Sequence, residues 1–241
     1  MDLFSFEFAD RRIEVYRSIY APVKSNMFTI LTGNEAVVFD PNEDEELIEL
    51  FKEKGIENIL ALRGDIVPDI EPKKDFLHAS DLCEYIQQRG DFELAGACYP
   101  EMHLEAESMV EDIRNLKTKV EKGATHLISQ LFFDNSAFYS FMDMVRCAGI
   151  DVPVSAGIMP VTNKKQIERM VSMCGASLPS KFSKIMQRYE NNPDALRDAG
   201  IAYAVEQIVD LIANGVEGIH LYTMNNPYVA TKITEAIGSL L

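Results

Sequence analysis

The sequence lacks tryptophan, has only four histidines in 241 residues, and forms no C-x-x-C pair from its four cysteines. His78, His103, His126 and His220 are each isolated, whereas a zinc site needs three or four convergent ligands, so zinc hydrolysis is disfavoured and we expect no metal site. Widely spaced cysteines favour reduced thiols in a cytoplasmic protein over a disulfide framework. No run approaches 18 apolar residues, and the start has no basic segment followed by an apolar core. We therefore expect neither a membrane span nor a secretion signal.

Basic residues are also scarce. Lys and Arg number 23 against 38 Asp and Glu, which gives a net charge of −15. Such a surface repels phosphate backbones, so a nucleic-acid partner is not expected. An anionic small ligand would have to be held by a few local cations or by backbone amides. The hydrophobic content of 47% is sufficient for a full core in one or two domains.

The first 57 residues differ in pattern from residues 58–241, and we expect a domain boundary there. Turn signals separate short β-type runs at 3–8, 13–20, 27–31 and 36–39, and a helix is expected over about 43–54. From residue 56 onward, glycines end helices and strands follow, at about 59–62, 94–98, 126–133, 152–156 and 218–222. The intervening helices are expected at about 79–88, 105–122, 136–148, 164–173, 179–189, 193–214 and 226–239. Strands that alternate with helices indicate a parallel α/β fold.

The segment from Leu94 to Asp134 reads as one βαβ unit, and ligands of such folds bind beyond the carboxyl ends of the strands. In its helix, Ile113, Leu116 and Val120 repeat at i, i+3 and i+7 and should face the sheet. A second stripe repeats this spacing one step round the helix, at Asp112, Asn115 and Lys119. This second stripe is either a solvated flank or a set of side chains that reach a bound ligand.

Six blocks, in order and at matching spacing, resemble methylenetetrahydrofolate reductases over about residues 58–241. The blocks are ALRGD at 61–65, ACYPEMH at 97–103, D-x-x-N-L-K-x-K-V at 112–120, Q-x-F-F-D at 130–134, GIMPVTN at 157–163 and YTMNN at 222–226. The resemblance implies an eight-stranded β/α barrel, of which this chain matches the last five strands. The expected fold is therefore α/β: a partial (β/α)8 TIM-type barrel with a β-hairpin-rich N-terminal segment.

The resemblance also implies a site and a reaction, the reduction of 5,10-methylenetetrahydrofolate to 5-methyltetrahydrofolate with FAD and NADH or NADPH. Asp65 is the expected catalytic residue, because a carboxylate can stabilise a cationic iminium in the substrate. Gln130 and Gln166 correspond to folate-binding positions, and a glutamine amide offers both a donor and an acceptor. FAD contacts are implied for Arg63, Gly64, Asp65, Ala97, Tyr99, His103, Asp112, Asn115 and Lys119. Phe132 and Phe133 are more readily explained as core residues.

Two further features bear on activity. Residues 25–55 are similar to the opening of metallo-β-lactamase-fold hydrolases, yet the histidine motif of those enzymes does not follow. Glu7, in FSFEFAD, resembles the string around the family's general acid, but its surroundings do not match. The alternative to an active reductase is therefore an impaired or inactive remnant that binds FAD or folate and lacks the first barrel strands. A homo-oligomer is possible.

Overall fold

The computed structural model describes residues 2–8, 11–20, 25–32, 35–39, 45–64 and 76–240, with side chains from Ile48 onward except at 164–166 and 168–169. The chain forms two compact units. The first comprises Met1–Ala97 and Asn115–Leu127, and the second comprises Cys98–Arg114 and Ile128–Leu241. In both units the strands are ordered as in the sequence, β1 to β7 in the first and β7 to β9 in the second.

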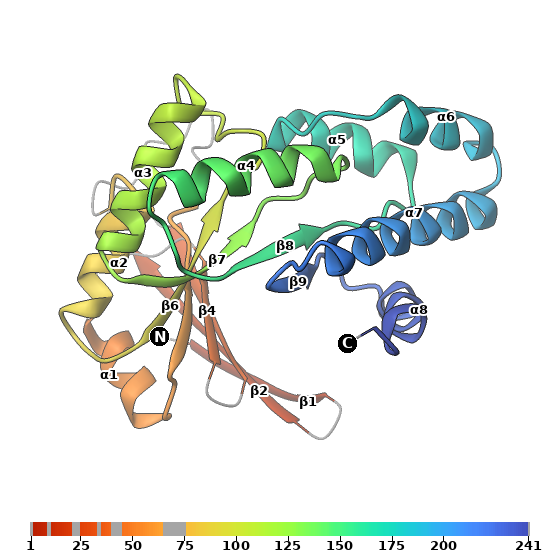
Figure 1. The fold of residues 1–241 in the computed structure, drawn as a ribbon. Helices are drawn as coiled ribbons and strands as arrows, with labels where there is room; N and C mark the ends of the chain where they lie inside the picture. Colours follow the sequence, from red (N-terminus) through yellow and green to blue (C-terminus); the bar gives the residue numbers. More distant parts are fainter. Residues whose placement is uncertain are drawn as a thin grey trace. The chain divides into compact units, whose positions relative to one another are not determined.

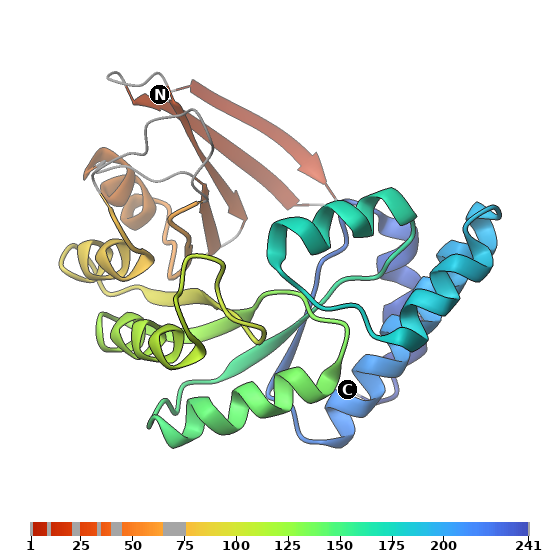
Figure 2. The same cartoon turned by 90° about the horizontal axis from the view of Figure 1, so that it is seen from above.

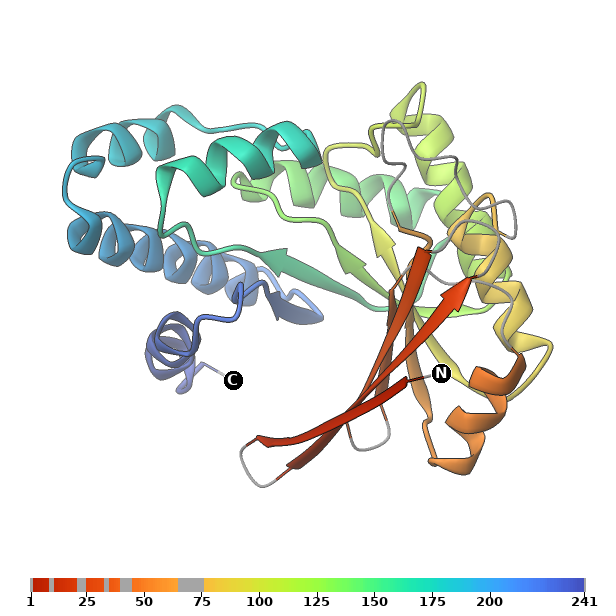
Figure 3. The same ribbon diagram turned by 180° about the vertical axis from the view of Figure 1, so that it is seen from behind.

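The first unit begins with four strands that pair antiparallel in sequence order (Figure 3). They are β1 (Asp2–Phe8), β2 (Arg11–Tyr20), β3 (Ser25–Thr32) and β4 (Glu35–Phe39). The pairing then changes direction: helix α1 (Glu45–Glu53) connects β4 to β5 (Asn58–Ala61), and these two strands are parallel. A crossover helix is the connection that parallel neighbours require.

The core of the first unit lies between α1, α2 (Ala79–Gln87) and the parallel strands β5 and β6 (Glu93–Cys98). Figure 2 shows the two helices in a view from above. Phe51 is fully buried and meets Phe92 edge to face at 6.4 Å. Gly123 ends α3 (Met109–Glu121) at φ +117° before β7 (Ala124–Ser129), a backbone conformation that favours glycine. The predicted junction of helix, glycine and strand is confirmed there.

The second unit contains the parallel pair β8 (Val154–Ile158) and β9 (Gly218–Leu221) and most of the helices. The helices are α4 (Asn135–Cys147), α5 (Lys164–Cys174), α6 (Ser180–Tyr189), α7 (Pro193–Ala213) and α8 (Pro227–Ile237). Helix α7 contacts both α6 and α8 (Figure 1). The core of the second unit includes Phe133, Met159, Phe182 and Leu196, which lie on four different segments of the chain.

The predicted α/β class and the five parallel strands β5 to β9 are confirmed, but two predicted boundaries are wrong by four residues. Strand β7 ends at Ser129 and not at Phe133. Leu131, Phe132 and Phe133 are buried, but they lie in the loop that follows the strand. An apolar run alone does not distinguish a strand from a buried loop. Helix α3 begins at Met109 and not at Glu105, whose N–H is bonded to His103 Nδ1 in the preceding turn.

Within the described part of the chain, every helix is too short or too polar to cross a bilayer.

Candidate active site

The end of β5 carries Arg63 and Gly64. The Arg63 guanidinium donates to the Gly64 carbonyl at 3.0 Å and to the Leu77 carbonyl at 3.1 Å, just before α2. Gly64 has φ +87°, which explains the glycine of the R-G-D triplet. Arg63 therefore shapes the chain around the strand end, a role that the sequence did not suggest. Asp65, the expected catalytic residue, lies outside the described residues.

Lys119 reaches the carboxyl end of β6 within the first unit. Its ammonium donates to the Ala97 carbonyl at 2.5 Å, and a Cβ on Gly96 would lie 2.8 Å from its Cδ. The lysine stem thus crosses β6 over the glycine and places a cation at the strand end. Asn115, one turn earlier in α3, is exposed. The second helical stripe therefore has different environments at different positions.

In the second unit, a tight turn after β6 brings Tyr99, His103 and Asp112 together. Met102 adopts φ +75° and the rings of Tyr99 and His103 meet edge to face at 4.4 Å. The Asp112 carboxylate accepts the His103 backbone N–H at 2.8 Å. Since His103 Nδ1 accepts the Glu105 N–H at 3.1 Å, the neutral ring carries its proton on Nε2. The turn therefore groups a phenol, an imidazole and a carboxylate beside one another.

Gln130 follows β7 and is held at three points. Its N–H donates to the Cys98 carbonyl at 2.7 Å, and its own carbonyl accepts the Ser129 hydroxyl at 3.0 Å. The side-chain carbonyl accepts the Leu131 N–H at 2.9 Å. Within the described part of the chain its amide nitrogen makes no hydrogen bond, so it can donate to a molecule outside the chain. Gln166 lies in α5, and its side chain is not among those described.

Sequence reasoning missed the buried contacts behind Gln130. Ser129 is fully buried, and its hydroxyl accepts the Gly157 N–H at 2.8 Å. The Tyr222 hydroxyl donates to the Ser129 carbonyl at 2.8 Å, and a Cβ on Gly157 would lie 2.1 Å from that same oxygen. Burial, and secondarily Cys98 and Cys174, raises the pKa of Tyr222 to about 12. Gly157 and Tyr222 are the first residues of the GIMPVTN and YTMNN blocks. Membership of these blocks was the sequence signal that could have identified them.

The rest of the Q-x-F-F-D block is structural. Phe132 and Phe133 are buried, as predicted for core residues, and stack on Phe138 and Phe182 at 5.1 and 5.0 Å. Asp134 caps α4, because its carboxylate accepts the Ser136 N–H at 2.9 Å. The described residues contain no group of three or more His, Cys, Asp or Glu side chains placed to hold a metal ion.

In each unit polar side chains follow the carboxyl ends of parallel strands, the position at which β/α proteins bind their ligands, and the chain is thus a protein of the β/α class. The sequence model described as Methylenetetrahydrofolate reductase matches residues 30–238. The chain belongs to the methylenetetrahydrofolate reductase family. This match includes residues 30–57, so the resemblance of that stretch to metallo-β-lactamase-fold hydrolases gains no support.

Individual relatives agree with the family assignment. The chain is 35% identical over 193 residues to 5,10-methylenetetrahydrofolate reductase of Pectobacterium carotovorum, and this alignment covers 80% of the chain and 64% of the relative. It is 36% identical to the Salmonella typhimurium enzyme, with coverage of 76% and 62%. It is 34% identical to methylenetetrahydrofolate reductase (NADH) 1 of Arabidopsis thaliana, with coverage of 80% and 35%. The chain thus spans somewhat less than two thirds of the two bacterial relatives.

Proposed function

We propose that the protein catalyses the reduction of 5,10-methylenetetrahydrofolate to 5-methyltetrahydrofolate, with FAD as the cofactor and NADH or NADPH as the reductant. The observation that carries the proposal is the family match over residues 30–238, which contains all six motif blocks. NADH appears in the name of the Arabidopsis relative. The alternative of an inactive remnant is not favoured, because the residues of the resembled site are retained.

The donor set fits a flavin dinucleotide. Lys119 is a local cation in a chain of net charge −15, which suits an anionic diphosphate. His103 would donate from Nε2, while Asp112, whose carboxylate accepts the His103 N–H, would accept a hydrogen bond from a ribose hydroxyl. Tyr99 would pack its ring against the cofactor. We assign supporting cofactor contacts to Arg63, Gly64, Asp65, Ala97 and Asn115.

The chain's own residues would act mainly by orientation and charge. Bound FAD would supply hydride-transfer chemistry. Asp65 would stabilise the cationic iminium that forms when the methylene bridge of the substrate opens. Gln130 would donate its amide N–H to an acceptor on the folate ring, since its carbonyl oxygen is already bonded to Leu131 N–H. Gln166 would contact the same ring.

The finer organisation is also a proposal. We expect a partial (β/α)8 barrel formed by the last five β/α units in residues 58–241, and a β-rich segment with one helix in residues 1–57. We further expect a cytoplasmic protein that forms no nucleic-acid or membrane complex, with a homo-oligomer as one possible state.

The first test is the visible absorption spectrum of the purified protein, with and without added FAD. We expect a bound flavin that NADH or NADPH bleaches and methylenetetrahydrofolate reoxidises. Lys119→Met should weaken FAD binding roughly tenfold, because it keeps the stem over Gly96 but removes the charge. Lys122→Met is the matched control, since it removes only a surface ion pair with Glu84, and such pairs contribute about 0–1 kcal/mol. A colourless protein that takes up no FAD would contradict the proposal.

A further inference from the structure

Helix α7 has an unusual buried face. Gly200, Tyr203 and Gln207 repeat at i, i+3 and i+7 and so share one side of the helix. Gln207 is only 6% exposed, and a buried amide in a helix interior needs hydrogen-bond partners to offset its desolvation. The partners of this face are two loops of the second unit.

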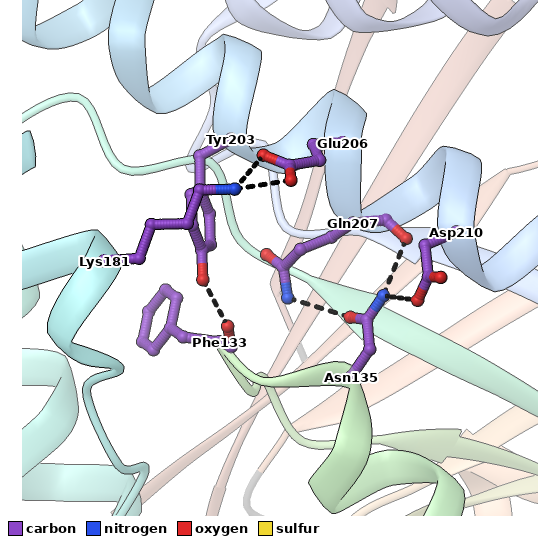
Figure 4. Close-up of polar contacts among 7 residues, drawn as sticks. All are labelled: Phe133, Asn135, Lys181, Tyr203, Glu206, Gln207 and Asp210. Carbon is purple, nitrogen blue, oxygen red and sulfur yellow. Dashed lines mark hydrogen bonds and ion pairs between the residues drawn. The ribbon is translucent and has the colours of Figure 1, made fainter.

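The first loop is the segment between β7 and α4 (Figure 4). The Tyr203 hydroxyl donates to the Phe133 carbonyl at 2.6 Å, and Gln207 Nε2 donates to the Phe132 carbonyl at 3.3 Å and to Asn135 Oδ1 at 3.2 Å. Asn135 Nδ2 donates back to the Gln207 carbonyl at 3.0 Å. Because β7 ends at Ser129, these two buried carbonyls lie outside the strand ladder, and α7 supplies the donors.

The solvent side of this contact is covered by a charged pair. Lys181 Nζ donates to Glu206 Oε2 at 2.7 Å and lies 5.9 Å from the centre of the Tyr203 ring. Burial raises the pKa of Tyr203 to about 12, with further contributions from Asp134 and Glu206. The phenol is therefore neutral and a hydrogen-bond donor at physiological pH.

The second loop runs from β8 to α5. A Cβ on Gly200 would lie 1.7 Å from the Val161 carbonyl oxygen, so the backbone of this loop rests directly on the helix. Asn163 ends this loop, and Gln166 follows in α5. One face of α7 thus contacts both loops that lead to the residues assigned to folate, Gln130 and Gln166.

We propose that Tyr203 and Gln207 are positioning residues for the folate-side ligand. They fix the carbonyls of Phe132 and Phe133 and thereby hold Gln130 two residues earlier, where its amide donates. The inference rests on the proposed function. It adds to the proposed site two residues that lie outside the six motif blocks. In this role neither side chain contacts the substrate or the cofactor.

The test compares Tyr203→Phe with Tyr139→Phe. Both tyrosines make a 2.6 Å hydrogen bond that involves α7, but the Tyr139 hydroxyl donates to Asp210 and so joins α4, not the loop, to the helix. We expect Tyr203→Phe to lower kcat/KM for methylenetetrahydrofolate roughly tenfold, since small misplacements of reacting groups are costly, with flavin reduction by NADH within about twofold of wild type. Tyr139→Phe should leave both rates within about twofold.

Hydrogen exchange of the Leu131 amide tests the same inference without turnover, because this N–H is bonded to the Gln130 side chain. We expect roughly tenfold faster exchange in Tyr203→Phe than in Tyr139→Phe, as local opening becomes easier. Equal exchange in the two variants, or a parallel loss of folate and NADH rates, would overturn the positioning role. If wild type shows no folate turnover, the proposed function fails while exchange still decides the positioning. Should Tyr203→Phe not fold, Gln207→Met is judged by the same criteria.

Discussion

Gly200→Ala is the sharpest test of how α7 packs. In an exposed helix interior, alanine is favoured over glycine by about 1 kcal/mol. Here the new Cβ would lie 1.7 Å from the Val161 carbonyl oxygen, whereas an ordinary contact begins at 3.4 Å. The helix and the loop would have to separate by about 1.7 Å, because a backbone oxygen cannot rotate away. Overpacking of this kind costs about 1–3 kcal/mol, so the net effect on the free energy of unfolding should be a loss.

Urea denaturation followed by circular dichroism measures this effect. Ala202→Gly is the matched control, because Ala202 is exposed in the same helix and its replacement reports the intrinsic preference alone. We expect Ala202→Gly to lower the free energy of unfolding by about 1 kcal/mol. If Gly200→Ala instead raises stability by a similar amount, the helix propensity outweighs the contact, and the close approach of the loop to α7 is refuted.

Three further outcomes are expected. Ser129→Ala should lower the free energy of unfolding in urea by about 1–3 kcal/mol, because it leaves the buried Gly157 N–H without its acceptor; an unchanged midpoint would contradict this bond. Stability should fall as the pH rises from about 10 to about 12, since burial raises the pKa of Tyr222 to about 12 and the neutral phenol is the form favoured by folding. Tyr222→Phe should reduce that slope in thermal melts across this pH range. Iodoacetamide at pH 8 should label exposed Cys147 and spare Cys83, whose burial raises its pKa to about 11; equal labelling of the native protein would refute this.

Local signals in the sequence were sufficient to predict the helices and strands but not the contacts between them. Glycine stops and apolar periodicity located the strands and helices within a few residues, and Ile113 and Leu116 are buried as their spacing predicted. Val120, on the same stripe, is only partly buried. Such patterns depend on the residues nearby in the chain, and one sequence contains that information.

The site depends on pairs that are far apart in the sequence. Tyr203 meets Phe133 across 70 positions, and Tyr222 meets Ser129 across 93, so no local pattern could pair them. Arg63 was expected to face a ligand, and its guanidinium donates to two backbone carbonyls that residue type alone does not identify. The resemblance indicated which blocks matter, while the geometry shows which side chains within them are bonded into the fold.

The linear order of the strands has a consequence for biosynthesis. Each paired strand in a unit lies beside the one made immediately before it, from β1 and β2 to β8 and β9. A strand that leaves the ribosome therefore finds its partner already made, across a short separation for the antiparallel strands β1 to β4 and across 63 positions for Ser155 of β8 and Gly218 of β9. Contacts of short sequence separation favour rapid folding and shorten the time for which a strand edge is exposed to aggregation. The order of synthesis is thus also a workable order of assembly.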